Sequence, residues 1–97
     1  MTTTNNTVKM VDPGAFDPEI ISIASGTSVH WVNVGKVPHN VTSNPGTLGC
    51  DPLSSENFDS GQVDPGSVFD HTFNTPGRFS YHCEIHGCEM KGTIIVT

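Results

Sequence analysis

The sequence holds few residues that favour helices. Only two of its 97 residues are Leu, and Ala, Leu, Met, Gln, Glu, Lys and Arg together number 16, whereas Val, Ile and Thr number 27. This balance disfavours a helical bundle and favours strands. Ten Gly and seven Pro supply the many turns that an all-β fold needs.

Long apolar runs and basic residues are also scarce. No run approaches the roughly 20 apolar residues of a membrane span, so we expect no membrane insertion. Lys and Arg number 4 against 10 Asp and Glu, which gives a formal charge of -6. Such a surface repels nucleic acid and anionic lipid and attracts basic partners. The alternative is that the charge serves solubility alone.

The length predicts one domain over residues 1–97, with a core thin enough that a disulfide or a metal would help to stabilise it. Three Cys are most simply explained by one disulfide and one thiol with a separate task. A disulfide implies an oxidising compartment. The first residues lack the basic and apolar regions of a signal peptide. We therefore expect a mature form or an excised domain of an extracytoplasmic protein, either unattached or anchored through a longer precursor.

Alternating apolar residues predict the strands. Ile21 and Ile23 precede a Ser-Gly turn, and the alternation resumes over residues 29–33, which predicts a hairpin with one buried face. In residues 79–83 the same pattern places Cys83 inward and leaves His82 outward, as an exposed surface histidine. About seven such strands indicate an antiparallel two-sheet sandwich.

One stretch near the C-terminus carries residues suited to metal chemistry. Cys83 ends a predicted strand, two residues separate it from His86, and three residues separate His86 from Met90. His39, at the start of an earlier strand, is the best candidate for a fourth ligand. Two His, one Cys and one weak axial Met form the ligand set of a blue copper site. The alternatives are a structural Cys83, a Met90 that only fills the core, and a zinc site, for which Met is a poor ligand.

The chain also resembles the cupredoxins of the plastocyanin, amicyanin and pseudoazurin group over nearly its whole length. The resemblance depends on five fragments in the family's order: Phe16-x-Pro18-x-x-Ile21-x-Ile23-x-x-Gly26-x-x-Val29-x-Trp31-x-Asn33, Pro38-His39-Asn40-Val41, Phe58-x-Ser60-Gly61 with Pro65-Gly66-x-x-Phe69, Phe73-x-x-Pro76-Gly77-x-Phe79-x-Tyr81-x-Cys83-x-x-His86, and Met90-x-Gly92-x-Ile94-x-Val96.

This resemblance implies a Greek-key sandwich of about seven or eight strands and one copper ion that cycles between Cu(I) and Cu(II). It assigns His39, Cys83, His86 and Met90 as copper ligands, and Asn40 as the residue that ties the two ligand loops together. The implied function is a soluble, monomeric one-electron carrier, not an enzyme, which exchanges electrons with redox proteins through the exposed edge of His86.

The copper loop departs from the family in ways that leave an alternative open. Ile85 stands where Pro is common, Cys88 is unusual, and the spacing from His86 to Met90 is one residue shorter than in plastocyanin and one longer than in amicyanin. If Met90 were distant, copper would have an open axial position. The chain would then be a small copper enzyme acting on a ligand such as nitric oxide.

Two further predictions concern the disulfide and the partner. Once Cys83 is assigned to copper, Cys50 and Cys88 remain to form a disulfide that anchors the long loop of residues 43–66; the alternative is two buried thiols. Acidic residues close to the expected copper end, including Glu84 and Glu89, predict a redox partner with a basic docking face.

Overall fold

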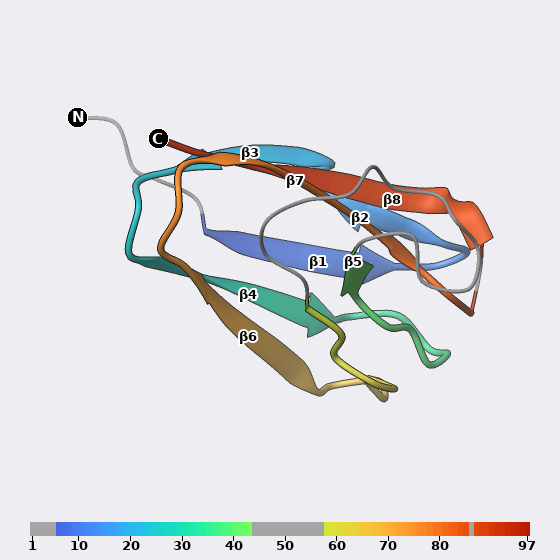
Figure 1. Cartoon of the computed structure of the whole chain (residues 1–97). Coiled ribbons are helices and arrows are strands. Elements are labelled where there is room, and N and C mark those ends of the chain that lie inside the picture. Colours follow the sequence, from blue (N-terminus) through green and yellow to red (C-terminus); the bar gives the residue numbers. More distant parts are fainter. Residues whose placement is uncertain (1–5, 44–57, 86) are drawn as a thin grey trace.

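A computed structural model of the chain describes residues 6–43, 58–85 and 87–97. These residues form eight strands, and none of them is helical (Figure 1). The strands are β1 (Thr7–Val11), β2 (Ala15–Asp17), β3 (Ile20–Ile23), β4 (Thr27–Asn33), β5 (Thr42–Ser43), β6 (Val68–Phe73), β7 (Gly77–Cys83) and β8 (Gly87–Val96). Within this part of the chain, there is no helix that could cross a membrane.

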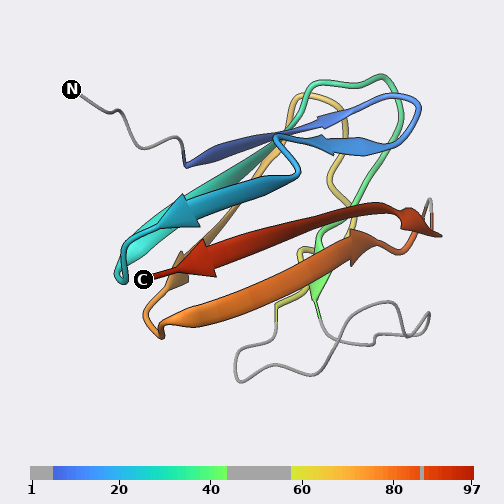
Figure 2. The same ribbon diagram turned by 90° about the horizontal axis from the view of Figure 1, so that it is seen from above.

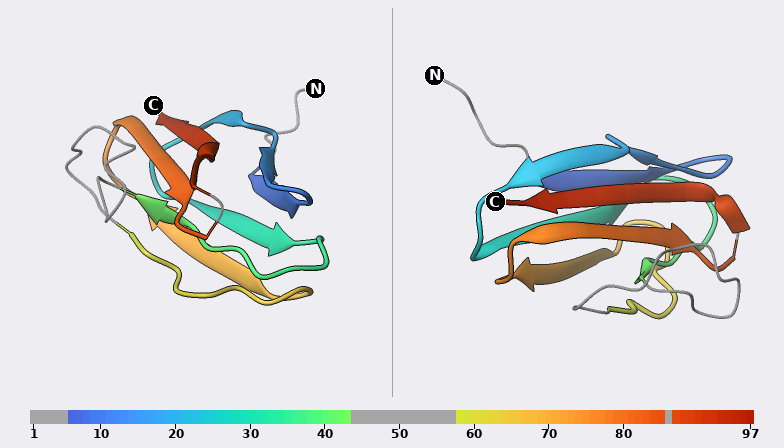
Figure 3. Two further views of the ribbon diagram at one scale, coloured as in Figure 1. Left: turned by 90° about the vertical axis from the view of Figure 1, so that its right-hand side faces the viewer. Right: turned by 45° about the horizontal axis from the view of Figure 1, so that its top comes forward.

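The strands form two four-stranded sheets. The two sheets face each other, as the views from above and from the end show (Figures 2 and 3). Their orders are β2-β1-β4-β6 and β3-β8-β7-β5. The predicted two-sheet sandwich is confirmed, although the pairing is mixed. Each sheet holds one parallel pair, β1 with β4 and β3 with β8, beside its antiparallel pairs.

The predicted hairpin of residues 21–33 is wrong, because β3 and β4 belong to different sheets. The turn between them contains Gly26, whose φ of +90° suits glycine and whose N–H donates to the Phe73 carbonyl at 2.7 Å. β3 instead pairs in parallel with β8, so that Ile21 lies opposite Ile94. Alternation shows that both strands bury one face. It does not show whether those faces belong to one sheet or to two sheets facing each other.

An aromatic cluster fills the space between the sheets. Trp31 is fully buried, and its ring centroid lies 5.4 Å from that of Tyr81 and 5.7 Å from that of Phe58. Burial raises the pKa of Tyr81 well above its ordinary value. Tyr81 lies opposite Gly92 in the β7–β8 pair, and a Cβ at position 92 would collide with the tyrosine ring and hydroxyl. Gly92 therefore provides the space that the central tyrosine occupies.

Candidate metal centre

Three segments meet at one end of the sandwich. They are the turn between β1 and β2, the residues that follow β4, and the connection from β7 to β8 (Figure 2). This arrangement brings His39 to the same end of the fold as Cys83 and Met90, which follow it by more than 40 residues in the sequence.

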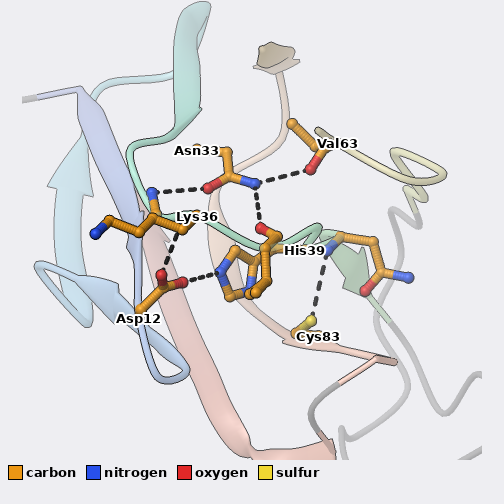
Figure 4. Close-up of polar contacts among 9 residues, drawn as sticks. Asp12, Asn33, Lys36, His39, Val63 and Cys83 are labelled. Atoms are coloured by element: carbon orange, nitrogen blue, oxygen red, sulfur yellow. Dashed lines mark hydrogen bonds and ion pairs between the residues drawn. The ribbon is translucent and has the colours of Figure 1, made fainter. Parts of the chain in front are cut away.

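His39 is held by backbone and side-chain contacts. Its backbone exchanges two hydrogen bonds with Val63, at 3.1 and 2.7 Å, in a short antiparallel bridge. Its ring is fully buried, and Nε2 lies 3.2 Å from Oδ1 of Asp12 (Figure 4). The other ring nitrogen, Nδ1, is buried as well. Because Nε2 faces Asp12, Nδ1 is the nitrogen that can serve as a metal ligand.

Cys83 ends β7, and its side chain is completely buried. The backbone N–H of Asn40 donates to the sulfur at 3.5 Å (Figure 4). The side-chain oxygen of Asn40 in turn accepts from the Glu84 N–H at 2.6 Å. Asn40 therefore connects the His39 segment to the end of β7 at two points. An N–H donor to sulfur also stabilises the negative charge of a thiolate ligand.

Met90 is reached through an irregularity in the β7–β8 pairing. His82 lies opposite Lys91, but Cys83 lies opposite Gly87, so the register shifts between two neighbouring residues of β7. Residues 88–90 of β8 therefore lie between two paired positions and have no paired residue in β7. Met90 is only 1% exposed, and it lines a surface hollow of about 250 Å³ together with Pro13, Gly14 and Glu89. A buried thioether is thus available on the side of the β1–β2 turn.

Other predicted residues fall outside what the structure describes. His86 and Cys50 lie outside the described residues, and so does the side chain of Cys88. Among the described residues, no three His, Cys, Asp or Glu side chains form a group that could hold a metal ion. Of the four predicted ligands, the structure describes His39, Cys83 and Met90, which include only one His and one Cys.

Asn33 supports this site and was not predicted to do so. Its amide nitrogen donates to the carbonyls of Val37 and Val63, both at 2.9 Å, and its oxygen accepts the Gly35 N–H at 2.9 Å (Figure 4). It therefore braces the loop that leads to His39 from two sides. A signal was present in the sequence, because Asn33 occupies an inward position of an otherwise apolar alternation. A polar side chain at such a position needs specific partners.

The prediction of an exposed His82 is wrong. His82 is fully buried, and its Nε2 lies 3.1 Å from a carboxylate oxygen of Glu84. Thr42, which lies opposite His82 in the β5–β7 pair, is only 6% exposed. The outward face of β7 is therefore covered at this point. Alternation distinguishes the two faces of a strand, but it does not show whether the outer face is covered.

Comparisons with known proteins agree with this geometry. The family described as copper binding proteins, plastocyanin/azurin family, matches residues 2–97. The chain belongs to that family. A plastocyanin of Scenedesmus fuscus is 38% identical over 93% of this chain and 97% of its own length. An amicyanin of Paracoccus versutus is 35% identical over 81% of this chain, and the match spans 54% of the amicyanin.

A solved structure shares both the fold and some sequence. It is described as a novel purple cupredoxin from Nitrosopumilus maritimus, and it is 26% identical to this chain, with a TM-score of 0.77. The match covers 94% of this chain and 98% of that one. Together with the family match, this confirms the predicted cupredoxin fold.

The relatives also test the predicted functional class. Plastocyanins and amicyanins are copper electron carriers and not enzymes, and members of the family bind one copper ion. They transfer electrons to partner proteins and are extracytoplasmic. The comparisons therefore confirm the predicted class, a copper electron carrier, and do not favour a small copper enzyme.

Proposed function

We propose that this chain holds one copper ion through His39, Cys83, His86 and Met90 and carries single electrons between redox proteins. The observation that carries the assignment is the Asn40 contact. Asn40, next to the buried His39, joins that segment to the end of β7 that carries the buried Cys83, through hydrogen bonds of 3.5 Å to Cys83 and 2.6 Å from Glu84. Bound copper supplies the one-electron chemistry.

The donor atoms fit copper better than zinc. A thiolate and a thioether suit Cu(I), and imidazole suits Cu(II). Structural zinc sites instead use four Cys, His or carboxylate ligands, and a neutral thioether contributes little to such a site. Cys83 and His39 are both completely shielded from solvent. Burial keeps water from the sulfur and limits rearrangement when one electron is gained or lost.

Electron exchange is proposed to pass through His86. The apolar side chains of Val34, Val37 and Ile85, which are 52%, 40% and 49% exposed, lie in the segments that meet at this end of the fold. An exposed apolar area of this kind supports brief contact with a partner rather than tight binding. A monomer that forms short-lived complexes with redox proteins suits this surface.

A direct test is reversible redox cycling of the copper-loaded protein. We expect one electron to be taken up and returned per chain, at rates set by the added redox protein. Azide or nitric oxide should leave the visible spectrum of the Cu(II) form unchanged, because four protein ligands fill the site. A new band on adding either ligand would instead indicate an open position and support the enzyme alternative.

We also propose that Cys50 and Cys88 form a disulfide. Its support is the odd count of three Cys, of which one is assigned to copper. In the chain-entropy model such a bridge contributes roughly 3–4 kcal/mol. An oxidising, extracytoplasmic location follows from it. Because buried thiols would also escape alkylation in the folded protein, the protein is first unfolded and freed of copper without reductant. Mass spectrometry should then detect alkylation of Cys83 alone, and three alkylated cysteines would exclude the bridge.

A further inference from the structure

The carboxylate of Asp12 contacts two other segments of the site. Asp12 directly follows β1, and its Oδ1 lies 3.2 Å from Nε2 of His39, which is 27 residues away in sequence. Its Oδ2 accepts the Lys36 N–H at 2.7 Å (Figure 4). The two oxygens are thus used separately, one toward the histidine ring and one toward the loop that leads to it.

We propose that Asp12 is a positioning residue that sets the tautomer and ring orientation of His39. A carboxylate can only accept hydrogen bonds, so its contact requires the proton on Nε2 of the neutral ring. The lone pair is then on the buried Nδ1, which is the nitrogen a copper ion needs. This inference rests on the copper site proposed above.

The surrounding backbone holds the carboxylate in place. The Lys36 N–H fixes Oδ2, so that Oδ1 is directed toward the imidazole. A Cβ on Gly35 would collide with the Asp12 carboxylate, so glycine at this position leaves the carboxylate the space it occupies beside His39. Pro13 and Gly14, next in the chain, line the hollow at Met90. One short turn therefore contacts the His39 ring through Asp12 and lines the hollow at Met90 through Pro13 and Gly14.

An anionic partner on the distal nitrogen changes what a histidine ligand does. It makes the imidazole a stronger donor, and removing such partners typically costs about 10–100-fold in metal affinity. A stronger donor stabilises Cu(II) more than Cu(I). Asp12 should therefore raise the affinity for Cu(II) and lower the reduction potential.

The first test needs no metal. Nitrogen-15 NMR of the apo protein should show the proton of His39 on Nε2 and none on Nδ1. In Asp12→Ala the ring should populate both neutral tautomers. A wild-type spectrum with the proton on Nδ1 would overturn the proposal, whether or not any variant folds.

The second test uses the copper-loaded protein and a matched control. Asp12→Ala should lose about 10–100-fold in Cu(II) affinity and raise the reduction potential, with Asp12→Asn between it and the wild type. Gly35→Ala, which displaces the carboxylate but keeps it, should shift the potential in the same direction by less. The control is Asp17→Asn, which removes one charge from the exposed partner of Lys9 on the same hairpin.

The two proposals fail in different ways. Suppose that Asp12→Ala and Asp17→Asn have the same His39 tautomer, the same Cu(II) affinity and the same reduction potential. Asp12 then does not position His39, and the proposed copper site is unaffected. If the wild-type protein binds no Cu(II), the copper site fails regardless of Asp12, and the tautomer measurement still decides the contact.

Discussion

Asn40 acts on both sides of the proposed copper site through two different groups. Its backbone N–H donates to the Cys83 sulfur, and its side-chain oxygen accepts from the Glu84 backbone. The side chain therefore fixes the start of the β7–β8 connection relative to the His39 segment. The backbone bond persists whatever side chain stands at position 40, so the two contributions can be separated.

Asn40→Ala should lower the free energy of unfolding by about 1–3 kcal/mol, because it removes the acceptor of a partly buried backbone N–H. Chemical denaturation of the apo protein measures this loss. The control is Asn74→Ala in the exposed β6–β7 turn, which should change stability by less than about 0.5 kcal/mol. Equal losses in the two variants would mean that the Asn40 bridge contributes nothing.

Met90→Leu should raise the reduction potential while copper still binds. The substitution keeps an apolar side chain of similar volume in a position that is 1% exposed, so stability should change by less than about 1.5 kcal/mol. Loss of the thioether removes a weak donor that favours Cu(II). Voltammetry decides the question, and an unchanged potential would show that Met90 only fills the core.

At the scale of the strands, the β7–β8 pair determines where the proposed ligands lie. Regular pairing runs from Gly77 opposite Val96 to His82 opposite Lys91, and the register then shifts at Cys83. The regular part is anchored by Tyr81 against Gly92 in the centre of the core. A displacement of this pair would move Cys83 and Met90 relative to each other.

Gly92→Ala should therefore destabilise the protein by about 1–3 kcal/mol, as overpacking does in well-packed cores. Tyr81→Phe removes the hydroxyl closest to the added methyl group, so the double variant should recover part of that loss. A double-mutant cycle by thermal or chemical denaturation measures the coupling. Strictly additive losses would show that the methyl group is accommodated without contacting Tyr81.

Alternation in the sequence was enough to predict the sandwich and which faces of most strands are buried. It failed where the answer depends on contacts between distant segments. The β3–β4 hairpin was wrong because two strands facing each other across a core share one pattern. Asp12 looked like an ordinary turn residue before proline and glycine, and nothing local indicates its contact with His39. The long-range supports of the site therefore emerged only from the fold.

At the scale of the whole molecule, the charge of -6 is expected to shape encounters with partners. Electron exchange with a cationic redox protein should slow as salt rises, because the Debye length shrinks to about 8 Å at 0.15 M. Charges mainly accelerate encounter and add less to affinity. A partner with a basic docking face would meet Glu89, which is exposed beside Met90.

Two variants can show which end of the molecule attracts a cationic partner. Each of them makes the net charge less negative by one unit. Glu89→Gln changes the charge at the site end, and Asn74→Lys changes it at the opposite end of the sandwich (Figure 1). We expect Glu89→Gln to slow exchange at low salt more than Asn74→Lys does, in stopped-flow measurements. Equal effects, or rates that salt does not change, would mean that the charge serves solubility alone.

The measurement that tests the copper assignment most directly is the visible absorption spectrum of the Cu(II)-loaded protein beside that of Cys83→Ser. A thiolate bound to Cu(II) gives an intense charge-transfer band, which a hydroxyl ligand does not give. We predict a strong band in the wild-type protein and its loss in Cys83→Ser, even where copper still binds. A colourless wild-type complex, or a Cys83→Ser protein that keeps the band, would contradict the assignment of Cys83 as a copper ligand.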